Sequence, residues 1–144
     1  MSVKDLFHHA VRCGLQKDHL AINDDPLNQG NCAMEKLEQY RTCIQTLLEK
    51  HSQYKPHPED VENELIFDTL RDHYQLMRVG WNGLKRVYYT VLHFDIKDGK
   101  IWLQQNTTDI DVGQELLEMG IPKEDIILGL HPPYKRPYTG YGVA

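Results

Sequence analysis

Apolar residues recur with a period of about 3.6 residues in the stretch that follows Met34, which is the period of one face of an α-helix. The residues in this pattern are Leu37, Tyr40, Ile44, Leu47 and Leu48. The pattern stops before Pro56 and Pro58, which cannot continue a helix. The sequence therefore predicts a helix that begins at Met34 and ends before Pro56.

Extended structure is predicted next, over residues 61–79, with an interruption around Arg71-Asp72. Asn82-Gly83 and Asp98-Gly99 are hairpin turn signals, because both central residues of a type I′ turn need a positive φ. Residues 85–96, rich in β-branched and aromatic side chains, and residues 100–105 supply the following strands. Together these segments predict an antiparallel β-meander.

The two turns also predict the register, and the register decides which side chains share a face. The predicted pairs are Ile96 with Ile101, Asp95 with Trp102, Phe94 with Leu103, His93 with Gln104, Met77 with Tyr88, and Leu76 with Tyr89. One face, the predicted core face, collects Met77, Val79, Tyr88, Leu92, Phe94, Ile96, Ile101 and Leu103. The other collects Tyr74, Leu76, Val87, Tyr89, Val91, His93, Asp95 and Trp102. Because this second face is rich in aromatics, we expect a helix or another subunit to cover it, for example in a homodimer.

A second helix carries Leu116, Leu117 and Met119, with Thr108 or Asp109 as its predicted N-cap. Gly120 and Pro122 end it. Residues 126–130 predict a final short strand. The expected fold is α+β: an antiparallel β-meander with an N-terminal helix and a second helix before a final short strand.

The first 33 residues differ from the rest. Leu6, Phe7, Ala10, Val11 and Leu15 indicate a short amphipathic helix, with Ser2 as its N-cap, and residues 28–31 (NQGN) have the composition of a turn or linker. A segment of this length cannot bury a core alone. We therefore predict two parts, an N-terminal segment over 1–33 and a domain over 34–144.

Composition excludes several classes of protein. The chain has 144 residues, a net charge of −5 and 40% hydrophobic residues, which suits one soluble domain and argues against broad binding to nucleic acid. It shows neither a signal peptide nor a membrane span. Cys13, Cys32 and Cys43 lack paired or metal-ligand spacing, so free thiols in a cytoplasmic protein are expected.

Candidate chemistry is confined to a few acids and histidines: Asp68, Asp72, His73, His93 and Asp95. The predicted register places Asp72 opposite His93 on the face of Asp95, with His73 on the other face. Such a cluster could hold a divalent metal or activate a water. No HExxH, GxSxG or glycine-rich phosphate loop accompanies it, which favours a structural hydrogen-bonding role. We expect no catalytic residue, metal or cofactor.

Aromatic and cationic side chains alternate near the C-terminus, where Tyr134, Lys135, Arg136 and Tyr138 follow one another closely. Tyr and Arg are enriched at protein interfaces, and aromatics can also stack on single-stranded nucleic acid. Our candidate partner-binding residues are Tyr89, Trp102, Tyr134, Lys135, Arg136 and Tyr138.

Six ordered segments resemble the XisI family, the fdxN-element excision controlling factors of cyanobacteria. They are residues 34–41 (MEKLEQYR), 66–69 (IFDT), 71–74 (RDHY), 79–81 (VGW), 95–102 (DIKDGKIW) and 120–126 (GIPKEDI). Residues 4–8 (KDLFH), 17–18 (KD) and 24–27 (DDPL) are similar to the opening of XisH, a partner family that resembles nucleases. The chain thus looks like a short XisH-like remnant and linker fused to a whole XisI-like domain.

The resemblance implies a non-enzymatic accessory factor that controls site-specific excision of a DNA element during heterocyst development. It also implies a XisH-type protein as the partner. Two alternatives from the residues themselves stay open. One is a metal-dependent hydrolase that uses Asp72, His93 and Asp95, and the other is a nucleic-acid-binding module that uses the C-terminal Tyr/Lys/Arg segment.

Overall fold

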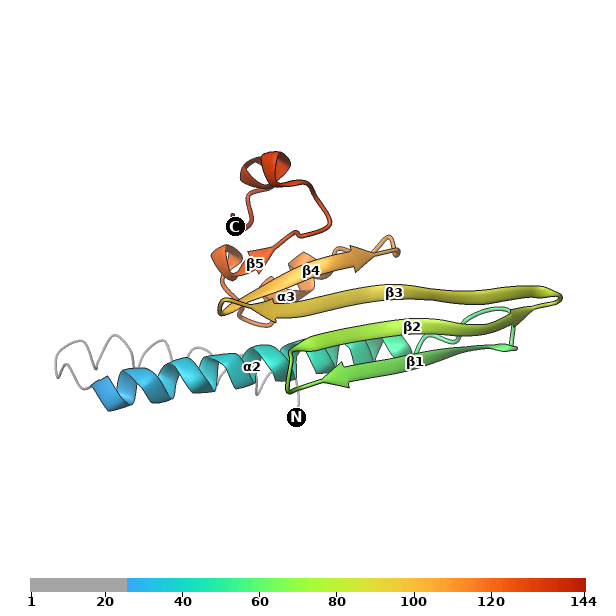
Figure 1. The fold of residues 1–144 in the computed structure, drawn as a ribbon, viewed down its shortest axis with the longest axis horizontal. Helices are drawn as coiled ribbons and strands as arrows, with labels where there is room; N and C mark the ends of the chain where they lie inside the picture. Colours follow the sequence, from blue (N-terminus) through green and yellow to red (C-terminus); the bar gives the residue numbers. More distant parts are fainter. Residues whose placement is uncertain (1–25) are drawn as a thin grey trace.

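The computed structural model describes the backbone of residues 26–144 and the side chains of residues 34–144. A long helix packs against one face of a five-stranded sheet, and a short second helix lies near it (Figure 1). The elements are α2 (Pro26–Ser52), β1 (Val61–Asp68), β2 (His73–Asn82), β3 (Lys85–Lys97), β4 (Lys100–Asn106), α3 (Val112–Glu118), β5 (Ile126–Ile127) and the 3₁₀ helices η1 (Lys123–Asp125) and η2 (Pro133–Tyr138). The predicted α+β class is confirmed.

Helix α2 buries the predicted stripe, because Tyr40, Ile44, Leu47 and Leu48 are all buried. Its start was predicted wrongly. The helix begins at Pro26, so residues 28–31 are helical rather than a linker. Proline suits the first turn of a helix. Gly30 inside the helix costs about 1 kcal/mol, which is small beside the stabilisation from the packing of the later turns. The predicted helix with Leu6 and Ser2 lies outside the described residues. The boundary between 33 and 34 stays a prediction.

The sheet has the order β1-β2-β3-β4-β5. The first four strands form the predicted antiparallel meander, and β5 joins β4 in parallel after the crossover through α3. The pairs Ile96–Ile101, Asp95–Trp102 and Phe94–Leu103 are confirmed. Asp98 and Gly99 have φ values of 54° and 73°, as a type I′ turn requires.

The β2–β3 turn lies one residue later than predicted. Asn82 pairs with Lys85, so the two central residues are Gly83 and Leu84. Only Gly83 has a positive φ, 62°, as in a type II′ turn with glycine first. Met77 therefore pairs with Thr90 rather than Tyr88.

A β-bulge at Val91 changes the faces further. Leu76 pairs with Leu92 and not with Tyr89, because β3 holds one extra residue at this point. Tyr74 and Leu76 consequently face α2 and are buried, although they were predicted on the opposite face. Tyr88 was predicted in the core and is exposed.

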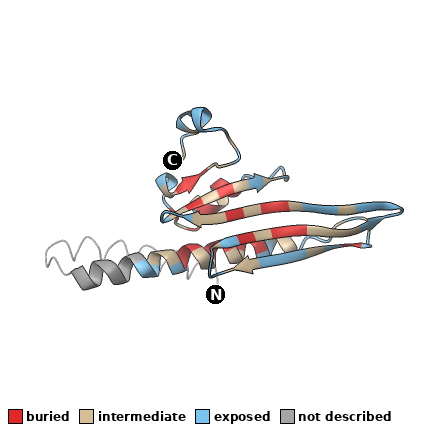
Figure 2. Ribbon diagram, viewed as in Figure 1, coloured by how far each residue is buried: buried red, intermediate tan, exposed pale blue. Residues whose placement is uncertain are grey.

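The core lies between α2, α3 and the facing side of the sheet (Figure 2). Its fully buried large side chains are Tyr74, Phe94, Ile44, Leu47, Leu48, Leu92, Ile101, Leu116, Ile126, Ile127 and Val112. Cys43 packs among them as a free thiol. No described helix is long and apolar enough to cross a membrane.

Two details of the second half differ from prediction. Helix α3 is capped by Asp111, whose carboxylate accepts from the Gln114 N–H at 3.0 Å. Thr108 and Asp109 do not cap the helix. The Thr108 N–H and hydroxyl donate to the side-chain oxygen of Asn106, which holds Thr108 in a tight turn before the helix. Strand β5 ends at Ile127 rather than residue 130, because the Gly129 N–H bonds back to the Ile127 carbonyl and turns the chain.

The C-terminal segment returns to the sheet after η2. The Gly142 N–H donates to the Ile126 carbonyl at 2.9 Å, and Gly142 forms a parallel bridge with Ile127. This segment is therefore packed on the domain as part of the fold.

Asp125 joins η1 to α2 and should make stability depend on pH. Its carboxylate accepts from the Tyr40 hydroxyl and from Lys36, whose Nζ lies 2.7 Å away. Burial alone would raise the pKa of Asp125, but Lys36 and Tyr40 bring it below its usual value. A depressed pKa adds stability above the unfolded value of about 3.9 and loses it as pH falls through the folded value.

We expect Asp125→Ala to lower the free energy of unfolding by about 2 kcal/mol at pH 7, since hydrogen bonds to a charged group are lost. The difference from wild type should shrink as pH falls below about 4 toward the lower pKa of the folded state, below which the carboxylate is protonated in both states. Urea unfolding at pH 7 and pH 3 measures both values. The exposed neighbour variant Glu124→Ala is the control, and a pH-independent difference for Asp125→Ala would contradict the assignment.

Candidate functional site

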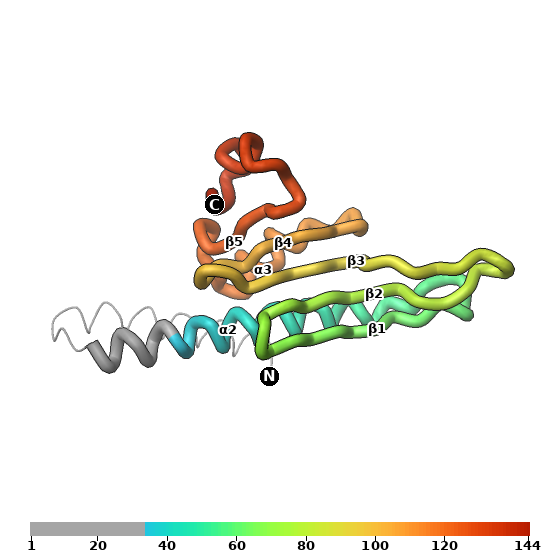
Figure 3. The backbone as a smooth tube through the Cα atoms, in the orientation of Figure 1, coloured from blue at the N-terminus to red at the C-terminus, as the bar shows by residue number. Residues whose placement is uncertain are grey.

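The β2–β3 hairpin extends past β4 and β5 as an arm, with β1 beside β2 for most of its length (Figure 3). Strand β4 pairs with β3 only from Leu92 to Lys97, whereas β1 pairs with β2 along the arm up to Gly80. Among the described residues, no strand pairs with the outer edge of residues 85–89 of β3. This open edge carries Lys85 and Arg86, and such charges disfavour unspecific strand pairing.

Large side chains gather at the end of the arm. We call Trp81, Leu84, Arg86 and Tyr88 the hairpin cluster. Trp81, Leu84 and Tyr88 are 49%, 100% and 65% exposed. The Arg86 guanidinium lies 5.5 Å from the Trp81 ring and 5.7 Å from the Tyr88 ring, and it donates to the Gly80 carbonyl at 3.3 Å. These cation–π contacts hold both aromatic rings in place while leaving them accessible.

Sequence reasoning missed this cluster. It placed Tyr88 in the core and did not single out Trp81. A signal was available, because Trp81 directly precedes the Asn82-Gly83 turn. A side chain at a hairpin end lies beyond the reach of the helices that cover the centre of the sheet.

The predicted candidates Tyr89 and Trp102 lie on opposite faces. Tyr89 pairs with Arg78, which alternates onto the same side as Leu76, and its hydroxyl accepts from the Arg78 Nη1 at 3.1 Å. Trp102 pairs with Asp95 on the outer face, away from α2. The bulge at Val91 separates them, so the prediction of a shared aromatic face is wrong.

Trp102 is covered by the chain's own C-terminal segment. The Lys97 ammonium lies 5.1 Å and the Arg136 guanidinium 5.2 Å from the centre of its ring. Arg136 also donates to the His131 carbonyl at 3.1 Å and to the Ala144 backbone oxygen at 2.8 Å. Trp102 and Arg136 therefore hold η2 against the sheet, and this geometry favours a structural role for these two residues.

The remaining predicted candidates are accessible. Tyr134 and Tyr138 are 69% and 88% exposed, and Lys135 between them is exposed as well. They form a second surface, here called the η2 surface. Figure 1 places it away from the end of the arm. The structure thus brings Tyr134, Lys135 and Tyr138 together but keeps them apart from Tyr89.

The predicted acid and histidine cluster is partly wrong. Asp72 is not opposite His93, because it lies in the turn before β2 and binds Arg41 and Tyr74. Asp68 accepts from the backbone N–H groups of Leu70 and Arg71 and closes the same turn.

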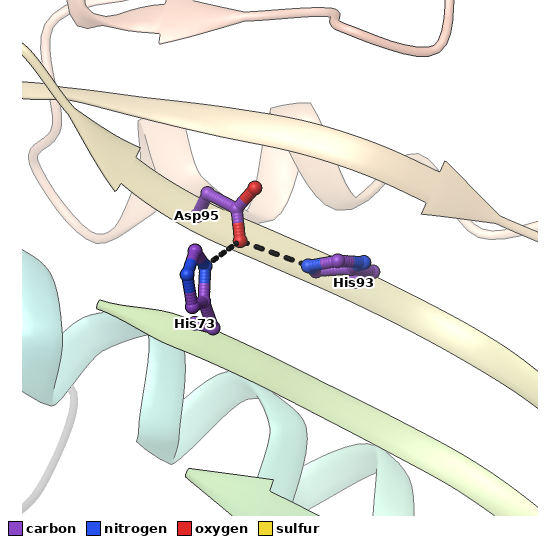
Figure 4. Close-up of side chains that lie close together, drawn as sticks. All are labelled: His73, His93 and Asp95. Carbon is purple, nitrogen blue, oxygen red and sulfur yellow. Dashed lines mark hydrogen bonds and ion pairs between the residues drawn. The ribbon is translucent and has the colours of Figure 1, made fainter. Parts of the chain in front are cut away.

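The histidine that joins Asp95 and His93 is His73, which was predicted on the opposite face (Figure 4). His73 pairs directly with Asp95 across the strands, and His93 pairs with Gln75. His93 is opposite Gln105 rather than Gln104, because a second irregularity follows it in the β3–β4 ladder. Burial alone would raise the pKa of Asp95, but hydrogen bonds from His73 and His93 bring it below its usual value.

Comparison with known proteins identifies the family to which the chain belongs. The profile of the XisI protein family matches residues 34–143. A crystal structure of a XisI-like protein from Anabaena variabilis is 56% identical, with a TM-score of 0.72 over 75% of this chain and 99% of the other. The fdxN element excision controlling factor XisI from Anabaena variabilis is 40% identical, with a TM-score of 0.68 over 76% of this chain and 99% of the other. None of the curated proteins compared with the chain matches it. The chain belongs to the XisI family.

Proposed function

We propose that this protein is a non-enzymatic accessory factor in the control of site-specific excision of a DNA element, and that it acts by binding a XisH-type, nuclease-like partner. Family membership and the Anabaena relative described as an fdxN element excision controlling factor support the role in excision. The observation that supports binding is the hairpin cluster, in which two exposed aromatic rings are held by one arginine.

The chemistry of the arm suits a protein partner. Trp, Tyr and Arg are the residue types that most often dominate the binding energy of an interface. Trp81 and Tyr88 can fill apolar pockets, and the fully exposed Leu84 extends the same apolar surface. Lys85 and Arg86 make this end of an otherwise acidic chain cationic. The complementary partner surface would therefore offer apolar pockets flanked by carboxylates.

Contacts within the chain favour the accessory role over the hydrolase alternative. The carboxylate of Asp72 is occupied by Arg41 at 2.7 Å and Tyr74 at 2.9 Å, and Asp68 is occupied by its own turn. A metal-dependent hydrolase needs carboxylates that converge on the cation beside its substrate. These two acids instead stabilise the β1–β2 turn.

The C-terminal segment suits nucleic acid poorly. Arg136 is held by Trp102 and two backbone oxygens, which leaves Lys135 as the exposed cation of η2. Salt-dependent binding to phosphates needs several free cations on one surface.

Co-purification tests the proposal. Expressed together, the full chain and a tagged XisH-type protein should form a complex that survives size exclusion, and the chain alone should leave duplex DNA intact with or without Mg²⁺. Sedimentation of the chain alone shows whether a second copy occupies the same surface. Metal-dependent cleavage by the chain alone that disappears in Asp95→Ala would favour the hydrolase, and salt-sensitive retention on DNA would favour the nucleic-acid module.

Residues 1–33 are expected to be dispensable for folding. The Anabaena relatives match about three quarters of this chain with 99% of their own length, and the family profile begins at residue 34. A chain that starts at Met34 should keep its melting temperature within a few degrees, the effect of roughly 1 kcal/mol in a domain of this size. Thermal unfolding followed by circular dichroism measures this, and loss of the cooperative transition would contradict it.

A further inference from the structure

Three potential metal ligands converge on the outer face of the sheet. The Nδ1 of His73, the Nε2 of His93 and a carboxylate oxygen of Asp95 all lie within 4.8 Å of one another. We propose that these residues form a binding site for Zn²⁺ or a similar first-row divalent ion that joins β2 to β3.

The register of the strands creates this convergence. His73 is the direct cross-strand partner of Asp95, and His93 lies two residues before Asp95 on the same strand and face. Each ring nitrogen is already 2.8 Å from the same oxygen, Asp95 Oδ1 (Figure 4). Both rings therefore direct a nitrogen at one carboxylate oxygen, which brings the three potential ligand atoms together.

The distances suit a zinc ion. Bonds of about 2.0–2.1 Å in tetrahedral geometry separate neighbouring ligand atoms by about 3.3 Å. The present nitrogen–oxygen distances of 2.8 Å would have to open by a few tenths of an ångström. The two ring nitrogens, which lie within 4.8 Å of each other on either side of the carboxylate oxygen, would have to approach to about the same spacing of 3.3 Å, which requires rotation of the His73 and His93 side chains. Each ring would bind the ion through the nitrogen that now faces the carboxylate, so a neutral imidazole would carry its proton on the other ring nitrogen.

The donor set selects the kind of ion. Two imidazoles and one carboxylate suit Zn²⁺ and related transition metals, whereas Ca²⁺ and Mg²⁺ prefer oxygen ligands alone. The side chains of His73, His93 and Asp95 are 52%, 27% and 16% exposed, so water can reach the ion and complete its coordination.

A further residue orients the carboxylate. Gln104 on β4 donates from Nε2 to Asp95 Oδ2 at 3.1 Å, which leaves Oδ1 directed at the two rings. Hydrogen bonds of this kind behind a ligand are typical of metal sites. The proposed site would therefore tie three neighbouring strands together at the base of the arm.

A second histidine–carboxylate pair in the chain provides a matched comparison. His51 Nε2 lies 2.7 Å from Glu115 Oε2, but the other oxygen of Glu115 binds Lys50 at 3.1 Å. This pair has a cation in the place of a third ligand, so it should not hold a metal. The proposal rests on the geometry at Asp95 and does not depend on the partner proposed above.

Zinc titration of the full chain tests the proposal, with calorimetry for affinity and mass spectrometry for stoichiometry. The chain has other histidines and cysteines, so the readout is the difference between wild type and variants. His73→Gln and Asp95→Asn should each lose one equivalent of Zn²⁺. Gln104→Leu should keep that equivalent with affinity weakened about tenfold to a hundredfold, as for other orienting residues. His51→Gln should match wild type.

A second measurement covers variants that fold poorly. Zn²⁺ should raise the melting temperature of wild type and of His51→Gln but not of His73→Gln, whose side chain is half exposed and tolerates replacement. Co²⁺ bound by wild type should show the visible absorption of a low-coordinate nitrogen and oxygen site. Equal Zn²⁺ stoichiometry and affinity in wild type and His73→Gln, or a Co²⁺ spectrum of the hexahydrated ion, would overturn the proposal.

Discussion

Replacing Asp72 with alanine is expected to lower the free energy of unfolding by about 3 kcal/mol, or about 10 °C in melting temperature. Asp72 accepts from Arg41 Nε at 2.7 Å and from the Tyr74 hydroxyl at 2.9 Å. Tyr74 is fully buried, so its hydroxyl would be left without an acceptor, which costs about 1–3 kcal/mol. Asp72 also has a φ of 60°, where alanine is disfavoured by about 1–2 kcal/mol relative to aspartate or asparagine. Thermal and urea unfolding measure the loss.

Asp72→Asn separates these contributions. Asparagine tolerates the positive φ and keeps one oxygen for the Tyr74 hydroxyl, but it gives up the charge that Arg41 neutralises. We expect a loss of about 1 kcal/mol, because the Arg41 side chain is partly exposed and water compensates for the missing pair. An alanine variant as stable as the asparagine variant would contradict this assignment. It would mean that Asp72 contributes to stability neither by accepting from the Tyr74 hydroxyl nor by tolerating the positive φ.

The role of Asp72 could not be predicted from one sequence. Its partner Arg41 is 31 positions away on α2, and the geometry of the turn decides whether the carboxylate points to the helix or to the sheet. The sequence pattern did reveal the interruption around Arg71-Asp72, because polar residues break an otherwise apolar run. It therefore located the turn but not the contact that stabilises it.

The two hairpins show why register was predictable in one place and not in the other. At Asp98-Gly99 both residues adopt the positive φ that the turn signal implies, so the pairs near the turn follow. At Asn82-Gly83 only the glycine does, and the pairs shift. The bulge at Val91 then exchanges the faces of β2 relative to the prediction. Packing of Val91 into the core favours the bulge, and that packing depends on residues far away in sequence.

The shifted β2–β3 turn and the bulge at Val91 also decided how much of the candidate site could be predicted from the sequence. The prolines of residues 133–138 predict that this segment lies outside a central strand whatever the register, and this is confirmed, but its 3₁₀ helix was not predicted. His73 was assigned to the wrong face because the bulge was not foreseen. His93 and Asp95 were placed on one face correctly, since alternation along a single strand needs no partner.

The hairpin cluster should supply much of the affinity for a XisH-type partner. We expect Trp81→Ala combined with Tyr88→Ala to weaken binding to a XisH-type partner at least about a hundredfold, because aromatic residues at interface centres often cost 2 kcal/mol or more each when truncated. Both side chains are exposed, so the melting temperature should change little. Calorimetry or surface plasmon resonance with the purified partner measures the affinity.

Two matched variants make the result specific to the arm. Tyr134→Ala combined with Tyr138→Ala removes two rings from the η2 surface that are more exposed than Trp81 and Tyr88, and Tyr54→Ala removes an exposed ring from the loop after α2. If the arm binds the partner, both should retain wild-type affinity. Arg86→Ala should fall between wild type and the double arm variant, because the two rings would lose the cation that holds them but keep their apolar surface. A hundredfold loss in the η2 variant with an unchanged arm variant would move the interface to Tyr134 and Tyr138, where the alternation of aromatic and cationic residues first pointed.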